Sequence, residues 1–172
     1  PQRIGVVARL TGRCMTEAEL SEKPPIDLVA AVDVSGSMAP AIDLLRQTMG
    51  FVTKELRSCD RLSIVTFASD AVVLLPHTAM NAEGKAAAAT AIAQIRAGGA
   101  TNFSGGVLTS LSELKMARIT SNQDKVSPAA VVVLTDGHPT AGIQGPVKIK
   151  QAIQAAHADI GFTAPLFTFG FS

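Results

Sequence analysis

Four short apolar runs, separated by segments with helical spacing, constrain this sequence more than any other feature. The runs cover residues 28–32, 62–68, 130–134 and 166–171, and each is too short to form a helix of ordinary length. Continuous apolar runs of this length are typical of strands buried on both faces, as in a parallel sheet covered by helices. The sequence therefore predicts an α/β fold.

Apolar residues in the intervening segments recur at the spacing of helices. The clearest stripe lies in residues 39–57, where Pro40 suits a first helical turn. Asn81 is expected to cap a second helix that ends at the glycine pair 98–99, a third follows Asn102, and a fourth starts at Pro146. The apolar residues expected on the inner faces are Ile42, Leu45, Met49, Val52 and Leu56; Ile92 and Ile95; Val107, Leu111 and Leu114; and Ile149, Ile153 and Ala156.

Two segments depart from the alternation of strands and helices. Residues 71–75 follow the second run after only two residues, too few for a parallel crossover, so they are expected to turn back as an antiparallel edge strand. Residues 4–10 read as an extra N-terminal strand, separated from the rest by a polar stretch at 16–25. We therefore expect an N-terminal strand and linker over 1–23, followed at 24–172 by one doubly wound domain with a mostly parallel central sheet, one antiparallel edge strand and helices on both faces.

Composition argues against several classes of partner. The 172 residues carry a formal net charge of +1, with the basic residues scattered, and contain no Trp or Tyr. Neither a basic face nor aromatic stacking platforms are therefore available for nucleic acid. No apolar stretch reaches the roughly 18 residues that a membrane span needs. Cys14 and Cys59 lack the spacing of a zinc site, and we expect two reduced, partly buried thiols, with a single disulfide as the alternative.

The segment Asp33-Val34-Ser35-Gly36-Ser37 lies directly between the first apolar run and the first helix. In a parallel α/β sheet this junction is the carboxyl edge, where ligands bind. Alternate side chains of an extended turn face the same way, so Asp33, Ser35 and Ser37 can direct three oxygens at one point. These residues predict half of a site for a hard cation.

Two further segments supply oxygen at the same edge. Thr135-Asp136-Gly137 follows the apolar run 130–134, and Thr101 lies in a glycine-rich loop over 98–102. Magnesium prefers about six oxygen ligands and retains several waters, which suits two carboxylates and three hydroxyls. Two carboxylates at most balance a divalent charge, so the ion would still accept an anionic oxygen from outside.

These segments, DVSGS at 33–37, Thr101 in GGATN and LTDG at 134–137, resemble the metal-ion-dependent adhesion site of von Willebrand factor A-type domains. The surrounding sequence, from about Pro24 to the end, is similar to the A-type domains of plant and algal proteins that also carry a RING-type ubiquitin-ligase module. The resemblance implies a metal set of Asp33, Ser35, Ser37, Thr101 and Asp136. This sequence differs from the family pattern at Ala100, which separates the glycine pair from Thr101.

The resemblance also implies a function. It predicts a non-enzymatic protein-binding module in which Mg²⁺, with Mn²⁺ or Ca²⁺ as alternatives, accepts an Asp or Glu side chain from a partner. Met38, Asn102 and His138 are the residues expected on the partner-binding rim. The family continues beyond the last apolar run with a further helix, so the chain is expected to be part of a longer polypeptide, truncated at its C-terminal side, with one side of the sheet uncovered. The plant-like resemblance favours the cytoplasm over the extracellular space.

Three other interpretations compete with this one. The turn at 33–37 could be a helix cap without a metal. The domain could be a scaffold subunit of a larger assembly in which the metal is structural and does not switch. A phosphatase-like hydrolase could use Asp33 as a nucleophile, although such enzymes place a second Asp where this chain has Ser35, and no well-placed Lys follows.

Overall fold

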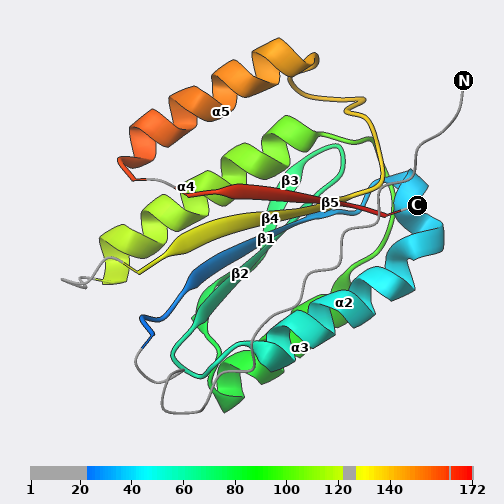
Figure 1. The fold of residues 1–172 in the computed structure, drawn as a ribbon. Helices are drawn as coiled ribbons and strands as arrows, with labels where there is room; N and C mark the ends of the chain where they lie inside the picture. Colours follow the sequence, from blue (N-terminus) through cyan, green and yellow to red (C-terminus); the bar gives the residue numbers. More distant parts are fainter. Residues whose placement is uncertain (1–22, 122–126, 163, 172) are drawn as a thin grey trace, which may run out of the picture.

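A five-stranded sheet forms the centre of the computed structural model, which describes residues 23–121, 127–162 and 164–171 (Figure 1). The strands are β1 (Asp27–Asp33), β2 (Arg61–Phe67), β3 (Ala71–Ala79), β4 (Ala129–Thr135) and β5 (Leu166–Gly170), in the spatial order β3-β2-β1-β4-β5. Strands β2, β1, β4 and β5 run parallel, whereas β3 is antiparallel to β2. The predicted mostly parallel sheet with one antiparallel edge strand is confirmed.

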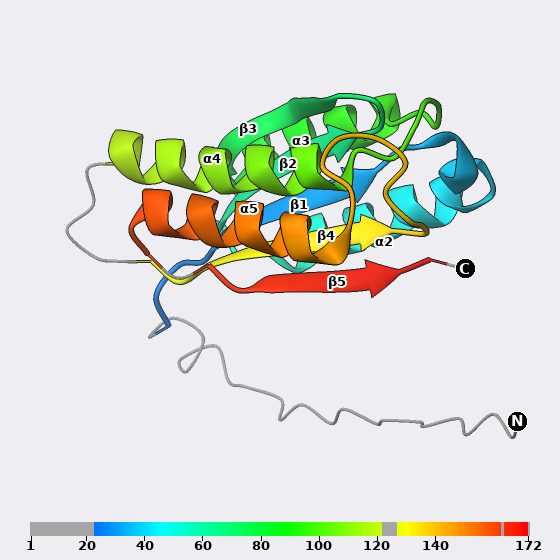
Figure 2. The same ribbon diagram turned by 90° about the horizontal axis from the view of Figure 1, so that it is seen from above.

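Helices cover the sheet on both faces (Figures 1 and 2). A 3₁₀ helix, η1 (Gly36–Ala41), leads into α2 (Ile42–Glu55), and α3 (Ala82–Gln94), α4 (Phe103–Ser121) and α5 (Pro146–Ile160) follow. Helices α2 and α3 lie on one face, and α4 and α5 lie on the other. Each face has its own apolar core. The first contains Leu45, Met49 and Ile92, and the second contains Val107, Leu111 and Leu114, as their spacing predicted.

Helix boundaries differ from the sequence prediction in two places. The segment around Pro40 is a 3₁₀ helix, in which the Met38 amide donates to the Ser35 carbonyl three residues back. Proline has no amide hydrogen to extend an α-helical ladder from this position. Helix α3 is capped by the Asn81 side chain as predicted, but it ends at Gln94 instead of at the glycine pair. The residues after Ile95 then leave the helix and approach the end of β1.

The antiparallel edge strand is longer than predicted, because β3 continues to Ala79 through Pro76. An edge strand tolerates proline, since one side of its backbone has no partner strand. The predicted N-terminal strand at 4–10 and Cys14 lie outside the described residues. Cys59 is a free and exposed thiol, and the expectation of partial burial is wrong for it. No helix in the described ranges is long and apolar enough to cross a membrane.

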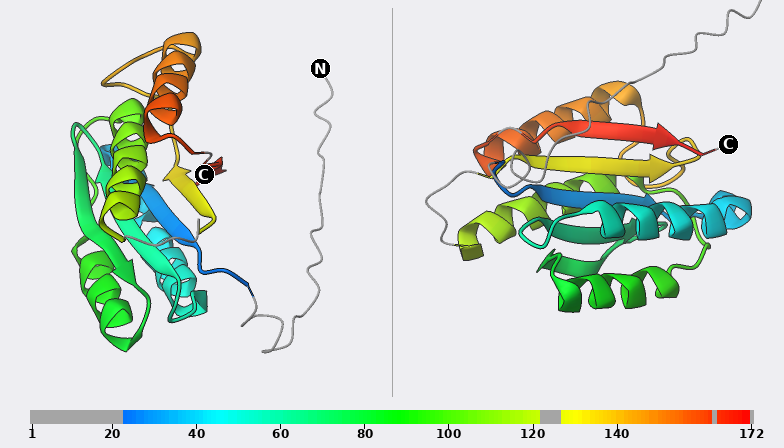
Figure 3. Two further views of the ribbon diagram at one scale, coloured as in Figure 1. Left: turned by 90° about the vertical axis from the view of Figure 1, so that its left-hand side faces the viewer. Right: turned by 60° about the horizontal axis from the view of Figure 1, so that its bottom comes forward.

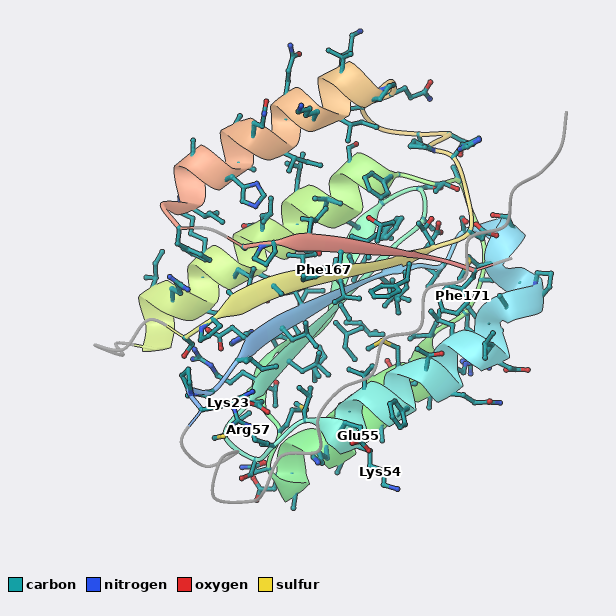
Figure 4. All side chains as sticks on the ribbon, in the orientation of Figure 1. Lys23, Lys54, Glu55, Arg57, Phe167 and Phe171 are labelled. Atoms are coloured by element: carbon teal, nitrogen blue, oxygen red, sulfur yellow. The ribbon has the colours of Figure 1, made fainter. Side chains whose placement is uncertain are left out.

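The β5 side of the sheet is covered on one face only. Helices α2 and α3 lie over the β1, β2 and β3 half, so one face of β4 and β5 is left without a helix (right panel of Figure 3). Phe167 and Phe169 of β5 are 50% and 55% exposed as a result. Figure 4 shows Phe167 on this strand and Phe171 just beyond its end. These exposures agree with the expectation of an uncovered side.

Buried charges tie the opposite, amino end of the sheet together. Asp27 begins β1 and accepts two hydrogen bonds from Arg61, its neighbour at the start of β2, at 2.7 and 2.8 Å. His77 of β3 bridges Asp27 and Ser63, with Nε2 3.2 Å from the Asp27 carboxylate and Nδ1 3.2 Å from the Ser63 hydroxyl. The Ser63 hydroxyl also lies 3.5 Å from a Glu113 carboxylate oxygen of α4. The network joins β1, β2, β3 and α4.

A second charged pair fixes the entry of the chain into β1. Asp60 accepts from the backbone amides of Ile26 and Arg57 and forms an ion pair with the Arg57 guanidinium. The same guanidinium donates to the carbonyls of Lys23 and Pro24, and Figure 4 shows Lys23 beside Arg57. The chain therefore enters the sheet in a defined direction.

We expect Asp27→Asn to lower the free energy of unfolding by about 3 kcal/mol at neutral pH, because the change leaves the Arg61 charge buried without its partner. Burial raises the pKa of Asp27, but hydrogen bonds from His77 and Arg61 and the Arg61 charge outweigh this effect and hold the pKa below its usual value. A depressed carboxyl pKa stabilises the folded state above the unfolded-state pKa and ceases to do so as the pH falls through the folded-state pKa.

The difference in unfolding free energy between wild type and Asp27→Asn should therefore be largest at neutral pH and shrink as the pH falls below the ordinary Asp pKa of about 3.9. Urea unfolding across this range measures it. Asp43→Asn is the matched control, since the Asp43 side chain is exposed and its pair with Arg46 lies at the surface. A constant difference at all pH values would contradict the role assigned to the Asp27 charge.

Candidate functional site

Asp33 ends β1 at the centre of the sheet and is fully buried. One carboxylate oxygen accepts the Ser35 amide at 2.8 Å, and the other accepts the Thr135 hydroxyl from the end of β4 at 2.5 Å. Among the residues that the structure describes, no Lys, Arg or His forms an ion pair with this carboxylate. A buried carboxylate without a counter-charge is costly unless a cation approaches it.

From Asp33 a chain of polar contacts leads outward to solvent. The Ser35 and Ser37 hydroxyl oxygens lie 3.1 Å apart, and the Ser37 hydroxyl donates to the Asp136 carboxylate at 3.0 Å. Ser35 is buried, Ser37 is exposed and Asp136 is intermediate. Because the Ser37 hydroxyl donates to Asp136, it accepts from the Ser35 hydroxyl, and its second lone pair remains free to face a cation. Four of the five predicted ligands are thus brought together, open to solvent on one side.

The glycine-rich loop joins these residues through its backbone. The Gly98 amide donates to the Val34 carbonyl at 2.7 Å, and the Gly36 amide donates to the Gly99 carbonyl at 3.0 Å. Gly99 has a φ of 82°, a conformation that favours glycine. The two reciprocal bonds hold the 98–101 loop against the turn that carries the two serines.

Thr101 is held in place from a third direction. Its amide donates to the Thr140 hydroxyl at 2.9 Å, and its carbonyl accepts the amides of Thr140 and Ala141 at 3.0 and 3.2 Å. The Thr101 side chain is buried, and within the described ranges its hydroxyl makes no hydrogen bond. The structure therefore connects the Thr101 loop to both other segments, without a direct hydrogen bond from its hydroxyl to the other predicted ligands.

The donor set fits a hard cation and no soft metal. All five side chains offer oxygen, as Mg²⁺ and Ca²⁺ prefer. In the part of the chain that the structure describes, no group of three or more His, Cys, Asp and Glu residues could hold a metal. A cation at this edge would therefore rest on two carboxylates and the neutral hydroxyls between them.

The three predicted rim residues have different environments. Met38 is completely buried in the α2 and α3 core, so its placement on the rim is wrong: the 3₁₀ turn of η1 directs the side chain inward. Asn102 caps α4, with its side-chain oxygen accepting the Gly105 amide and its nitrogen donating to the Ser69 carbonyl. His138 is exposed in the loop after Asp136.

Sequence reasoning missed two residues that shape this site. Thr135 binds the Asp33 carboxylate, and its place at the end of a strand in the LTDG segment could have indicated this contact. Thr140 clamps Thr101 from a loop of irregular structure. No spacing in the sequence points to that contact, because it depends on how the loop after Asp136 folds back across the sheet edge.

A family comparison identifies the architecture around this site. The family model described as "von Willebrand factor type A domain" matches residues 28–138, more than half of the chain. The chain belongs to the von Willebrand factor type A family. The matched range includes all of β1 except its first residue, the glycine-rich loop and the end of β4, and so contains all five predicted ligands of this von Willebrand factor type A (vWA) domain.

Curated relatives of the vWA domain come from plants, bacteria and animals. It is 35% identical over 129 residues to the E3 ubiquitin-protein ligase WAVH1 of Arabidopsis thaliana, covering 70% of this chain and 19% of that protein. It is 32% identical to the uncharacterized protein YfbK of Escherichia coli strain K12, covering 87% and 24%. It is 28% identical to the human inter-alpha-trypsin inhibitor heavy chain H3, covering 86% and 16%. The chain thus spans about a fifth of these relatives.

Solved structures confirm the vWA fold. A von Willebrand factor type A protein from Catenulispora acidiphila superposes with a TM-score of 0.67 at 19% identity, covering 86% of this chain and 34% of the other. The PilB minor pilin of Streptococcus sanguinis superposes with a TM-score of 0.65 at 15% identity, covering 88% and 51%. Similarity at these identities concerns the fold.

We expect Thr140→Val to loosen the Thr101 loop, because valine keeps the shape of threonine but cannot accept a hydrogen bond from the Thr101 amide. A lost hydrogen bond of about 1 kcal/mol corresponds to roughly fivefold faster hydrogen exchange at that amide. Thr90→Val is the control, since the Thr90 hydroxyl donates to the Ala86 carbonyl on the exposed side of α3. Unchanged exchange at Thr101 would show that the clamp does not hold the loop.

Proposed function

We propose that this vWA domain binds a protein partner through a divalent cation, Mg²⁺ in cells, held by Asp33, Ser35, Ser37, Thr101 and Asp136. The observation that carries the proposal is the buried Asp33 carboxylate, with which no Lys, Arg or His among the described residues forms an ion pair, and which leads through Ser35 and Ser37 to solvent. A cation there would offset the cost of burying this charge.

Each residue of the proposed site has a different role. The Ser35 amide and the Thr135 hydroxyl hold the Asp33 carboxylate in place, so it supplies a negative charge at a fixed position. Ser35 and Ser37 supply neutral oxygens, and the Asp136 carboxylate accepts a hydrogen bond from the Ser37 hydroxyl. A bound ion would supply a Lewis-acidic position for one further anionic oxygen. A carboxylate from an Asp or Glu of the partner matches this position in charge and hardness.

The environment of Asp33 argues against catalysis. Ser35 stands where a phosphatase of the aspartyl-phosphate type would carry its acid/base carboxylate. We infer that any activity of a longer protein, such as the ligase activity in the name of WAVH1, would reside in other segments, with this domain recruiting a partner.

The first test measures magnesium binding by calorimetry. We expect Asp33→Ala to lower Mg²⁺ affinity by more than about tenfold, since even outer contacts of metal sites contribute that much. The variant should remain folded, because Asp33 lies at a strand end, and thermal unfolding checks this. Asp70→Ala is the matched control, an exposed carboxylate in the turn between β2 and β3. Unaltered affinity in folded Asp33→Ala would refute the ligand assignment.

The second test asks what the site recognises. A displayed library of random peptides is selected on the immobilised domain, once with Mg²⁺ and once with EDTA. We expect Asp or Glu to be enriched at one position with Mg²⁺ and not with EDTA, and not on Asp33→Ala. If the domain binds Mg²⁺ and chelation lowers its thermal stability, yet the selected peptides are the same with and without the metal, the scaffold interpretation is correct instead.

A further inference from the structure

An apolar groove of about 510 Å³ lies between α5, β4 and β5 on the face opposite α2. Its walls include Ile149 and Ile153 of α5 and Leu166 and Thr168 of β5. Helix α5 contributes no buried residue, so its apolar side chains remain partly accessible along the groove. The groove is thus an unfilled apolar surface between a helix and an edge strand.

The groove adjoins the candidate metal site. Thr135 and Gly137, the residues on either side of Asp136, are part of its lining, as is Pro139. The amino end of α5 lies at the same end of the sheet as the carboxyl ends of β1 and β4 (Figure 1). A peptide with one side chain at Asp136 would therefore have its neighbouring side chains at the mouth of the groove.

The loop and helix α5 along one side of the groove carry positive charge. Residues 137–158 contain no Asp or Glu, and they include Lys148 and Lys150, both exposed on α5. Lys150 lines the groove and Lys148 does not. Gly145 precedes α5 without a side-chain cap, so the positive end of the helix is not neutralised. An acidic segment of a partner would therefore match the charge of this surface.

We propose that the partner of this domain is an acidic segment with an apolar anchor. One Asp or Glu reaches the metal site, an apolar side chain close to it in sequence enters the groove, and a second carboxylate pairs with Lys150. This inference rests on the proposed function and adds to it the sequence pattern of the partner. The apolar anchor supplies affinity by burial, whereas the two carboxylates fix its register.

The groove is tested by filling it. Thr168→Trp places a large side chain in the groove from an exposed position of an edge strand. Val72→Trp is the matched control on the opposite edge strand, where Val72 is 56% exposed. In peptide selections with Mg²⁺, wild type and Val72→Trp should enrich one Asp or Glu together with a nearby Leu, Ile, Met or Phe. Thr168→Trp should retain the acidic position and lose the apolar one.

The basic contact is tested on one peptide selected by the wild type. Lys150→Glu should weaken its binding about fivefold at low salt, and most of this effect should vanish at high salt. Lys148→Glu, the same charge reversal outside the groove, should have a smaller effect. Equal effects of the two reversals would overturn the assigned pairing with Lys150.

The outcomes separate this inference from the function on which it rests. Selections that show no acidic position dependent on Mg²⁺ would overturn the proposed function and this inference together. An acidic position that depends on Mg²⁺, without a neighbouring apolar preference or with one that Thr168→Trp leaves unchanged, would overturn the groove alone.

Discussion

The Asp33 carboxylate lies where β1 and β4 end side by side, and the arrangement of the whole carboxyl edge depends on it. Its two oxygens are bound by the Ser35 amide and the Thr135 hydroxyl, so one charge fixes both the turn after β1 and the end of β4. Hydrogen bonds to a charged acceptor are stronger than neutral ones. No Lys, Arg or His within the described ranges forms an ion pair with this carboxylate, which is why we propose that a metal ion binds at this corner of the sheet.

The buried carboxylates at the two ends of the sheet differ in whether a cationic side chain pairs with them. At the amino end, Asp27 is matched by Arg61 and His77, so its charge is compensated within the protein. At the carboxyl end, the Ser35 amide binds Asp33 and the Ser35 and Ser37 hydroxyls lead on to Asp136, and neither carboxylate forms an ion pair with the residues that the structure describes. The ion pair of Asp27 therefore stabilises the amino end of the sheet, whereas Asp33, which has hydrogen-bond donors but no ion pair among the described residues, is where we propose that a cation binds.

The surface beside the carboxyl edge of the sheet also differs in charge, because it carries basic residues of α5. Helix α5 begins next to the segment that carries Asp136, and its first turns contain Lys148 and Lys150 without any acidic residue. The candidate metal site therefore adjoins the apolar groove, which Lys150 lines. Binding energy for a partner could come from all three, which would make the ion one determinant of recognition among several.

The sequence by itself determined the sheet and the ligand types. Buried runs such as 130–134 and the cap at Asn81 act locally, and oxygen residues at strand ends converge because parallel strands end at one edge. Only the tertiary structure decided which side chains meet. Met38 turned into the core because a 3₁₀ turn rotated it inward, and Thr140 reached Thr101 through a loop without periodicity. Such contacts join residues distant along the chain, and their geometry follows from packing, which local spacing does not encode.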